Sequence, residues 1–277
     1  MKRWFISLYL LLLGVLTIWA LTAMPANPVM LGPAGLMLAA GAPLAFFIWL
    51  VIARPARTES HPVLVSIAAG LGAVLAASAE YRFGPQYRPL LVAALAALAG
   101  WLAYLRWYSR LPSATGLIGP GQALPAVDLL DLDGTPVSTQ SLRGHPAVLL
   151  FYRGNWCPLC TAQIRELAEA WRSAEYREAR LWFISSQSQA HTRNIARRFA
   201  IPASFLRDPD NRAARLLGIL APGATPAGLE WLGYPSDAAI PTVIVVDANG
   251  IVRFVEAAGN YRLRPDPKHY LHHLQEH

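Results

Sequence analysis

The first 110 residues of this 277-residue chain contain very little charge. They hold 8 Lys and Arg residues and 2 Asp and Glu residues, whereas the other 16 basic and 15 acidic residues lie in residues 111–277. The whole chain is 15% charged, against about 25% in an average soluble domain. This shortage excludes disorder and an ordinary soluble enzyme as descriptions of the whole chain. The net charge of +7 does not indicate a nucleic-acid partner, because six of the seven net charges belong to residues 1–110, a part of the chain made mostly of apolar runs.

Four long apolar runs occupy the low-charge part, and each reaches the length of about 17–25 residues that crosses a membrane. The runs are Phe5–Met24, Gly32–Ala53, Pro62–Ala79 and Pro89–Tyr108. Only the fourth contains a charge, Arg106, near its end, where the side chain can reach the interface. Residues 1–110 are therefore predicted to form an all-α transmembrane region of four helices, with the lipid bilayer as partner. A signal peptide is the alternative for the first run, which is longer than the usual signal core of about 7–15 residues.

The basic residues near the run ends predict the orientation of this region. With the N-terminus inside, the outer segments carry Arg82 and Arg88, and the inner segments carry six basic residues: Lys2, Arg3, Arg54, Arg57, Arg106 and Arg110. We therefore expect a multi-pass protein of the cell membrane whose C-terminal part, after four spans, lies in the cytoplasm. A different number of spans would place that part outside.

Residues 111–121 are rich in Gly, Pro, Ser and Thr and predict a linker to a domain of residues 122–277. Short apolar runs predict strands at Ala126–Leu132, Pro146–Tyr152, Leu181–Ser185, Ser204–Leu206, Thr242–Val246 and Ile251–Glu256. Apolar residues at helical spacing predict helices at Thr161–Arg177, Gln189–Phe199, Asn211–Leu217 and Pro267–Gln275. The alternation of strands and helices predicts an α/β domain with a mixed sheet.

The chain has two cysteines, Cys157 and Cys160, and they lie between a predicted buried strand and a predicted helix. Free N–H groups and the partial positive charge at a helix start stabilise a thiolate, which is the reactive form of cysteine. A structural zinc site needs about four ligands, and the sequence has no second cysteine pair. The pair therefore predicts redox chemistry rather than a metal site or inert thiols. No phosphate loop, dinucleotide fingerprint or catalytic triad is present, so we expect no cofactor.

The segment Val148–Cys160, with the sequence VLLFYRGNWCPLC, resembles the active-site segment of the thioredoxin-fold redoxins. It is most similar to their peroxiredoxin-like branch, the alkyl hydroperoxide reductase and thiol-specific antioxidant family. Segments 205–219, 240–253 and 260–267 also resemble that family, so the likeness covers about residues 121–275. The resemblance implies a thioredoxin-like fold and an antioxidant thiol oxidoreductase that reduces a peroxide or a disulfide. An external thiol, thioredoxin-like or of low molecular weight, would then reduce the enzyme.

The resemblance leaves the roles of the two cysteines open. In a thioredoxin alignment, Trp156 precedes the nucleophile Cys157, and Cys160 resolves the mixed disulfide. In a peroxiredoxin alignment anchored on Phe151 and Tyr152, Cys160 is the peroxidatic cysteine, and Cys157 replaces a hydroxyl residue that helps to orient the peroxide. A disulfide reductase with little peroxidase activity and a membrane redox sensor or interaction protein are the alternatives to a peroxidase.

Four further residues are expected to support the cysteines. Pro241 stands where thioredoxin-like proteins have a cis proline and typical peroxiredoxins an arginine, so we expect a cis bond there, with a trans proline at a strand start as the alternative. Arg153 is the expected cation beside the thiolate; the alternative is a solvated loop charge. Trp156 is expected to shield the disulfide or to pack. Pro158 fits the first helical turn, since proline has no N–H to offer there.

Overall fold

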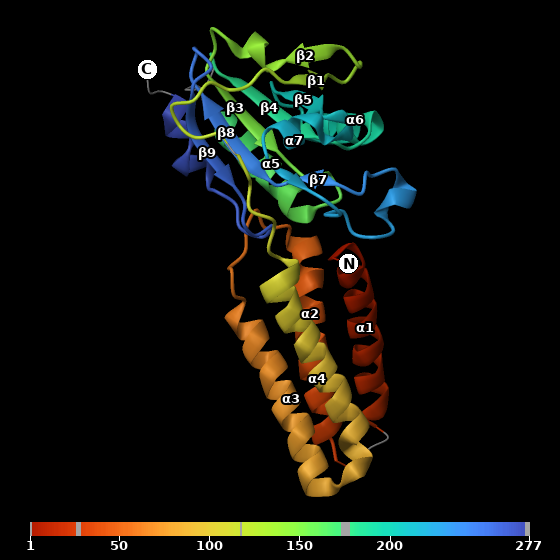
Figure 1. The fold of residues 1–277 in the computed structure, drawn as a ribbon. Helices are drawn as coiled ribbons and strands as arrows, with labels where there is room; N and C mark the ends of the chain where they lie inside the picture. The colour runs from red at the N-terminus through yellow and green to blue at the C-terminus, as the bar shows by residue number, and fades with distance from the viewer. Residues whose placement is uncertain (1, 26–28, 117, 173–177, 275–277) are drawn as a thin grey trace. The chain divides into compact units, whose positions relative to one another are not determined.

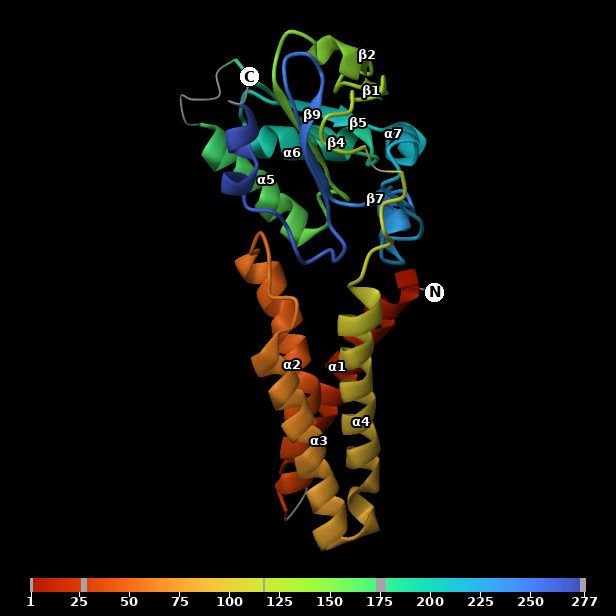
Figure 2. The same cartoon turned by 60° about the vertical axis from the view of Figure 1, so that its left-hand side comes forward.

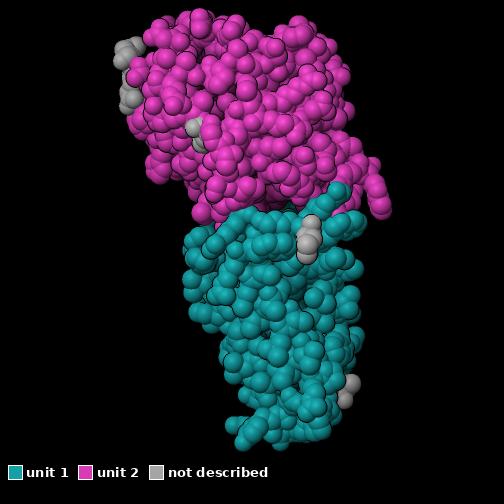
Figure 3. Space-filling view, in the orientation of Figure 1, with its two compact units in different colours: residues 1–53, 58–110 teal, residues 54–57, 111–277 magenta. Residues whose placement is uncertain are grey.

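The computed structural model describes residues 2–25, 29–116, 118–172 and 178–274. Within it the chain forms two compact units, which Figure 3 distinguishes by colour. Unit 1 consists of Met1–Ala53 and Thr58–Arg110, and unit 2 consists of Arg54–Arg57 and Leu111–His277. Unit 1 is built from helices and unit 2 from strands and helices, so the predicted combination of an all-α part and an α/β part is confirmed (Figure 1).

The long helices of unit 1 follow the four apolar runs. They are α1 (Lys2–Ala23), α2 (Leu31–Ala53), α3 (Val63–Phe83) and α4 (Arg88–Ala103). A 3₁₀ turn at Pro85–Tyr87 leads into α4, and a π-helical turn at Tyr104–Tyr108 continues it, so that the last helical stretch runs from Pro85 to Tyr108. All four stretches have the length and apolar composition of a membrane span.

Helices α2 and α3 approach each other closely at small residues. A Cβ atom added to Gly35 would lie 2.6 Å from the backbone nitrogen of Ala76, and one added to Gly72 would meet the backbone of Ala39. Small residues that allow such contact are typical of helix pairs in membranes, where dispersion contacts rather than the hydrophobic effect hold helices together. The two glycines therefore set the spacing of this pair.

Unit 2 contains a sheet of seven strands in the order β2-β1-β5-β4-β3-β8-β9 (Figure 1). The strands are β1 (Asp128–Leu130), β2 (Pro136–Ser138), β3 (Ala147–Phe151), β4 (Arg180–Ser185), β5 (Ser204–Arg207), β8 (Thr242–Val246) and β9 (Val252–Ala257). Strands β3, β4 and β5 are parallel, and the other neighbours in the sheet are antiparallel. The predicted mixed sheet is therefore confirmed. A separate two-stranded sheet pairs β6 (Leu220–Ala221) with β7 (Ala238–Ala239).

Helices cover both faces of the large sheet. Figure 2 shows α5 (Pro158–Trp171) and α6 (Gln189–Phe199) on one side and α7 (Arg212–Leu216) on the other. Side chains alternate along β3, so that Leu149 and Phe151 join the core cluster that contains Ala213 of α7. Every residue of β3 and of β8 is buried, as expected of central strands covered on both faces.

Two predicted helices differ from those observed. Helix α5 begins at Pro158 rather than Thr161, because the first helical position needs no N–H donor and accepts proline; the predicted end at Arg177 lies outside the described residues. The predicted α-helix at Pro267–Gln275 is wrong over its described part, which forms 3₁₀ turns at Pro267–His269 and Leu271–Leu274. Between them Tyr270 takes a φ of −131°, and its buried ring stacks on Phe254 with centroids 5.8 Å apart.

The residues expected to link the two parts make hydrogen bonds within unit 2. The backbone N–H of Leu111 donates to Gly259, and that of Gly121 donates to Val252, over 2.9 and 2.8 Å. Thr115 donates its N–H to Gly218, a glycine with a φ of +66° on which any side chain would collide with the Thr115 carbonyl. The described residues of this segment therefore belong to unit 2.

Candidate active site

The two cysteines lie where the chain leaves β3 and enters α5. Cys157 is the residue that precedes the first helical turn, with an extended backbone (φ −88°, ψ 113°), and Pro158 occupies the first helical position. Cys160 follows two residues later within the same turn. Both cysteines are free and buried, with 1% and 0% of their surface exposed. The site is therefore a reduced dithiol at a helix start, shielded from water.

The surroundings ionise the two thiols unequally. Burial opposes ionisation of Cys160, but a hydrogen bond from the Cys157 thiol, the positive charges of Arg264 and Arg153, and a hydrogen bond from the Arg153 backbone lower its pKa to about 5. The pKa of Cys157 is raised well above its usual value, first because its thiol is hydrogen-bonded to Cys160 and second because it is buried. The surroundings therefore favour a negative charge on Cys160, with Cys157 as the proton donor.

Arg153 is buried beside the cysteines between two aromatic rings. Its guanidinium carbon lies 4.6 Å from the ring centre of Trp156 and 5.2 Å from that of Tyr261, and Nη2 donates to the Ala224 carbonyl. Only 5% of the residue is exposed, so its charge is not that of a solvated loop. Gly154, with a φ of +152°, leaves room for the indole, because a Cβ there would lie 2.6 Å from Trp156 Nε1.

Arg264 supplies a second buried cation that the sequence analysis did not single out. It is 5% exposed, and Nη1 donates to the carbonyl of Leu263 over 2.8 Å. Within the described part of the chain, Nε and Nη2 have no hydrogen-bond partner. Its positive charge lowers the pKa of Cys160 and opposes the rise in the pKa of Cys157. A guanidinium with unused N–H groups next to a thiolate can also bind an oxygen atom that leaves during reaction.

A chain of side-chain hydrogen bonds holds the loop that precedes the cysteines. Gln187 Nε2 donates to the Tyr152 hydroxyl over 2.9 Å, and Gln187 Oε1 accepts from the backbone N–H of Asn155 over 2.9 Å. Tyr152 is completely buried, and both its burial and the charge of Cys160 raise its pKa. It therefore stays a neutral phenol next to the thiolate.

The segment 222–237, which joins β6 to β7, closes against the same loop. The Tyr234 hydroxyl donates to Asn155 Oδ1 over 2.6 Å, and its ring stacks on His191 with centroids 4.1 Å apart. His191 Nε2 lies 2.9 Å from the Leu232 carbonyl, which is in the 3₁₀ turn Leu229–Leu232. We call segment 222–237 the cover loop, because it contacts Arg153 through Ala224 and Asn155 through Tyr234.

Pro241 lies at the cysteine end of the sheet but is not a cis proline. No peptide bond is cis among the described residues, so the expected cis bond is wrong. Pro241 directly precedes β8, where the lack of an N–H breaks no strand pairing and a trans proline fits. Its carbonyl accepts from the backbone N–H of Ala258 over 2.9 Å. The pairing of Phe151 with Thr242 brings Pro241 next to Tyr152, at the end of β3.

The structure thus brings Cys157, Cys160, Arg153 and Trp156 together, with Pro158 starting the helix. It adds Arg264 and the cover loop, which sequence reasoning missed, because neither carries a local pattern that reveals its contacts around the site. Among the described residues, no group of three or more His, Cys, Asp and Glu side chains is arranged to hold a metal ion.

Comparisons with known proteins concern this C-terminal part. Residues 120–255 match the model of the AhpC/TSA family. Peroxiredoxin Q, chloroplastic, of Oryza sativa subsp. japonica is 27% identical over 158 residues, which cover 53% of this chain and 66% of that protein. Its counterpart in Sedum lineare is 28% identical over 150 residues, covering 53% and 73%. The chain therefore spans about two thirds of the length of these relatives.

A solved structure supports the fold. The crystal structure of a peroxiredoxin-like protein from Aquifex aeolicus superposes with a TM-score of 0.51 at 14% identity and covers 60% of this chain and 91% of that one. At this identity the likeness concerns the fold alone. Arg264 lies beyond the residues that the family model matches.

Proposed function

Since the C-terminal part of the chain is an AhpC/TSA-type, peroxiredoxin-like domain with a thioredoxin fold, we propose that the protein is a membrane-anchored thiol peroxidase in which Cys160 attacks the peroxide and Cys157 resolves the product. The observation that carries this assignment is the unequal ionisation of the two thiols. A thiolate, not a thiol, is the attacking species, and the Cys157 thiol, Arg264 and Arg153 all lower the pKa of Cys160, which supports Cys160 in this role.

The first step is a displacement at oxygen. The Cys160 sulfur attacks one peroxide oxygen, an S–O bond forms, and the O–O bond breaks with its electron pair on the departing oxygen. That oxygen leaves as an alcohol, or as water from hydrogen peroxide, after taking a proton. Arg153 and Arg264 are the cations available to stabilise its negative charge during departure. Cys160 is left as a sulfenic acid.

The second step closes a disulfide. The Cys157 sulfur attacks the Cys160 sulfur, an S–S bond forms, the S–O bond breaks, and the oxygen leaves as water after taking a proton. The hydrogen bond between the two thiols supports this role, because it requires their sulfur atoms to be neighbours. An external thiol reductant then reopens the Cys157–Cys160 disulfide by two thiol–disulfide exchanges. No organic cofactor or metal takes part in this cycle.

We infer that the cysteines react when the cover loop opens, since both are buried and the loop contacts Arg153 and Asn155, which neighbour them in the chain. Tyr234, His191 and Asn155 form the contact that must separate. Closure over a bound peroxide would exclude water and strengthen the electrostatic attraction between the two arginines and the reacting oxygen. We therefore assign the cover loop the role of a gate.

Single-cysteine variants of the full chain test the assignment. Cys157→Ser should still consume one equivalent of hydrogen peroxide and form a sulfenic acid that dimedone traps, whereas Cys160→Ser should form none. If Cys160→Ser instead traps a disulfide substrate at Cys157 and neither variant reacts with peroxide, the protein is a disulfide reductase and the peroxidase assignment is wrong.

A further inference from the structure

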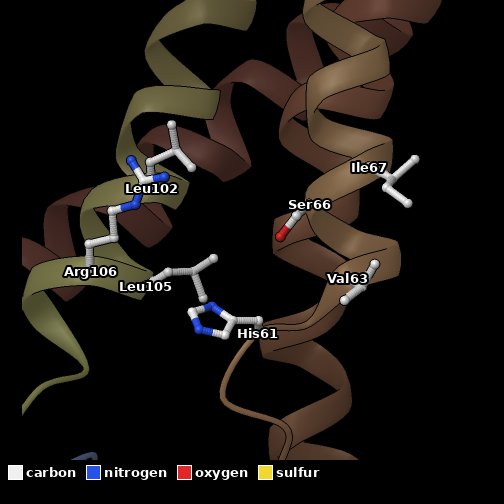
Figure 4. Close-up of a pocket in the computed structure, with 7 residues that line it drawn as sticks. All are labelled: His61, Val63, Ser66, Ile67, Leu102, Leu105 and Arg106. Carbon is white, nitrogen blue, oxygen red and sulfur yellow. The ribbon is translucent and has the colours of Figure 1, made fainter.

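Unit 1 contains a cavity of about 390 Å³ between the start of α3 and the end of α4 (Figure 4). We call it the α3–α4 cavity. Four apolar and three polar side chains line it: Val63, Ile67, Leu102, Leu105, His61, Ser66 and Arg106. The lining includes no acidic residue. The α3–α4 cavity therefore combines an apolar wall with a permanent positive charge.

Arg106 has no anionic partner in the part of the chain that the structure describes. Residues 1–110 contain only two acidic residues, Glu59 and Glu80. Glu80 Oε1 accepts from Arg88 Nε over 2.7 Å, and neither acid lines the cavity. Figure 4 shows the Arg106 side chain extending along α4 toward Leu102, so that the guanidinium lies beside an apolar side chain of the lining. An arginine near hydrocarbon is costly unless an anion accompanies it.

The backbone that carries Arg106 has an unusual conformation. In the turn Tyr104–Tyr108 the N–H of Ser109 donates to the Tyr104 carbonyl, five residues back, over 2.9 Å. This π-helical turn contains one more residue than an α-helical turn, so it rotates Leu105 and Arg106 relative to the face that α4 would otherwise continue. Such turns are rare and are found frequently at functional sites.

The Ser66 hydroxyl in the lining of the α3–α4 cavity is already engaged in hydrogen bonds within unit 1. Trp101 Nε1 donates to Ser66 Oγ over 3.0 Å, and Ser66 Oγ donates to the Pro62 carbonyl over 2.9 Å. These bonds fix α3 against α4 at the cavity and engage the Ser66 hydroxyl. Arg106 and His61 are therefore the polar side chains that remain to bind a ligand.

From this arrangement we propose that the α3–α4 cavity binds one anionic phospholipid, with its phosphate on Arg106 and an acyl chain against the apolar side chains of the lining. The excess of six positive charges in residues 1–110 favours an anionic lipid over a zwitterionic one. The apolar wall and the four span-length helices favour a lipid over free phosphate. The proposal rests on a membrane location of the helices and not on the chemistry of the cysteines.

Native mass spectrometry of the full chain in a non-ionic detergent tests this proposal. We expect one phosphatidylglycerol to remain bound, phosphatidylcholine to bind more weakly, and glycerol 3-phosphate not to compete. Arg106→Gln should weaken phosphatidylglycerol binding about tenfold, because it removes a charge-assisted hydrogen bond. The matched control is Arg82→Gln, an exposed arginine in the last turn of α3 outside the cavity, which should leave binding unchanged.

A second variant separates the cavity from general charge. Leu102→Trp fills the space while keeping every charge, and it should also release the lipid. Equal effects of Arg82→Gln and Arg106→Gln, or unchanged binding in Leu102→Trp, would overturn the proposal. Competition by glycerol 3-phosphate would show a site for free phosphate, and absence of bound phosphatidylglycerol from the parent chain would likewise refute a lipid site.

Discussion

Cys157 donates a hydrogen bond to Cys160, and this bond sets the two thiols apart in acidity. The donor keeps its proton, and the acceptor carries the negative charge beside two buried arginines. Of the two alignments open from the sequence, this relationship favours the one in which Cys160 attacks. It also makes Cys157 more than a resolving thiol, because it supplies the hydrogen bond that the replaced hydroxyl residue would otherwise offer.

The first prediction concerns the pH dependence of Cys160. Its pKa of about 5 lies below the ordinary cysteine value of about 8.5. The rate of oxidation by hydrogen peroxide should therefore rise as pH increases through about 5 and stay level to pH 7. Replacing Cys157 with Ala removes the hydrogen bond and should move this midpoint upward. Stopped-flow measurement of the first oxidation step, with thiolate absorbance as a second readout, tests both statements.

The expected shift has a clear sign. A hydrogen bond to the charged form stabilises the thiolate, so its loss raises the pKa and reduces the rate below the new midpoint. Cys157→Ser retains a hydroxyl donor and should lie between the parent chain and Cys157→Ala. A midpoint near 8.5 in the parent chain would contradict the assignment of the negative charge to Cys160.

The second prediction concerns Arg264. Arg264→Gln removes a buried cation whose charge lowers the pKa of Cys160, so the midpoint should rise by about one unit or more, the usual effect of losing a nearby opposite charge. The rate of peroxide oxidation at pH 6 should fall several-fold. Arg264→Lys keeps the charge and should restore much of the rate. Arg212→Gln, whose side chain is 80% exposed on α7, is the matched control and should react normally. Equal midpoints in Arg264→Gln and the parent chain would remove Arg264 from the site.

The position of Arg264 illustrates what the sequence could not predict. Apolar residues at helical spacing placed α6, and an apolar run placed β8, at their observed bounds, because both are local patterns. The cysteine motif likewise predicted a helix start. Arg264 becomes part of the site only because the C-terminal segment folds onto the sheet. The sequence around a single arginine does not predict that contact.

The conformation of Pro241 and the last helix were also predicted wrongly, for two different reasons. The cis bond was carried over from a family likeness, whereas the bond in this chain is trans. At Pro267–Leu274 a single helix was expected, but Tyr270 leaves the helical conformation as its ring packs on Phe254. At the last helix a tertiary contact thus overrides the local pattern, whereas at Pro241 the bond follows the ordinary trans preference and the family likeness does not hold.

The third prediction concerns opening of the cover loop. Tyr234→Phe removes the hydroxyl that donates to Asn155, a contribution of about 1 kcal/mol, which corresponds to about a fivefold increase in the open population. Alkylation of the cysteines by N-ethylmaleimide at pH 7 should accelerate by a similar factor. Tyr81→Phe, at a tyrosine that is 91% exposed, is the control and should react at the parent rate. If both variants match the parent chain, Tyr234 does not hold the gate.

The fourth prediction concerns the side of the membrane on which the cysteines lie. Because both native thiols are buried, the experiment uses a Cys157→Ser, Cys160→Ser background with one exposed reporter thiol. Gln86→Cys places it in the turn between α3 and α4, and Ser141→Cys places it in unit 2. With four spans and the N-terminus inside, an impermeant maleimide should label Gln86→Cys in intact cells and Ser141→Cys only after permeabilisation.

The outcome decides the redox state in which the cysteine pair rests. A cytoplasmic domain would meet reducing conditions that keep the pair as a dithiol, ready to react with peroxide. An external domain would meet oxidising conditions that favour the disulfide. Labelling of Ser141→Cys but not of Gln86→Cys in intact cells would reverse the orientation. Equal labelling of the two reporters in intact cells would place both on the same side of the membrane. Helix α4 would then not separate them as one span, and the four-span topology would be wrong.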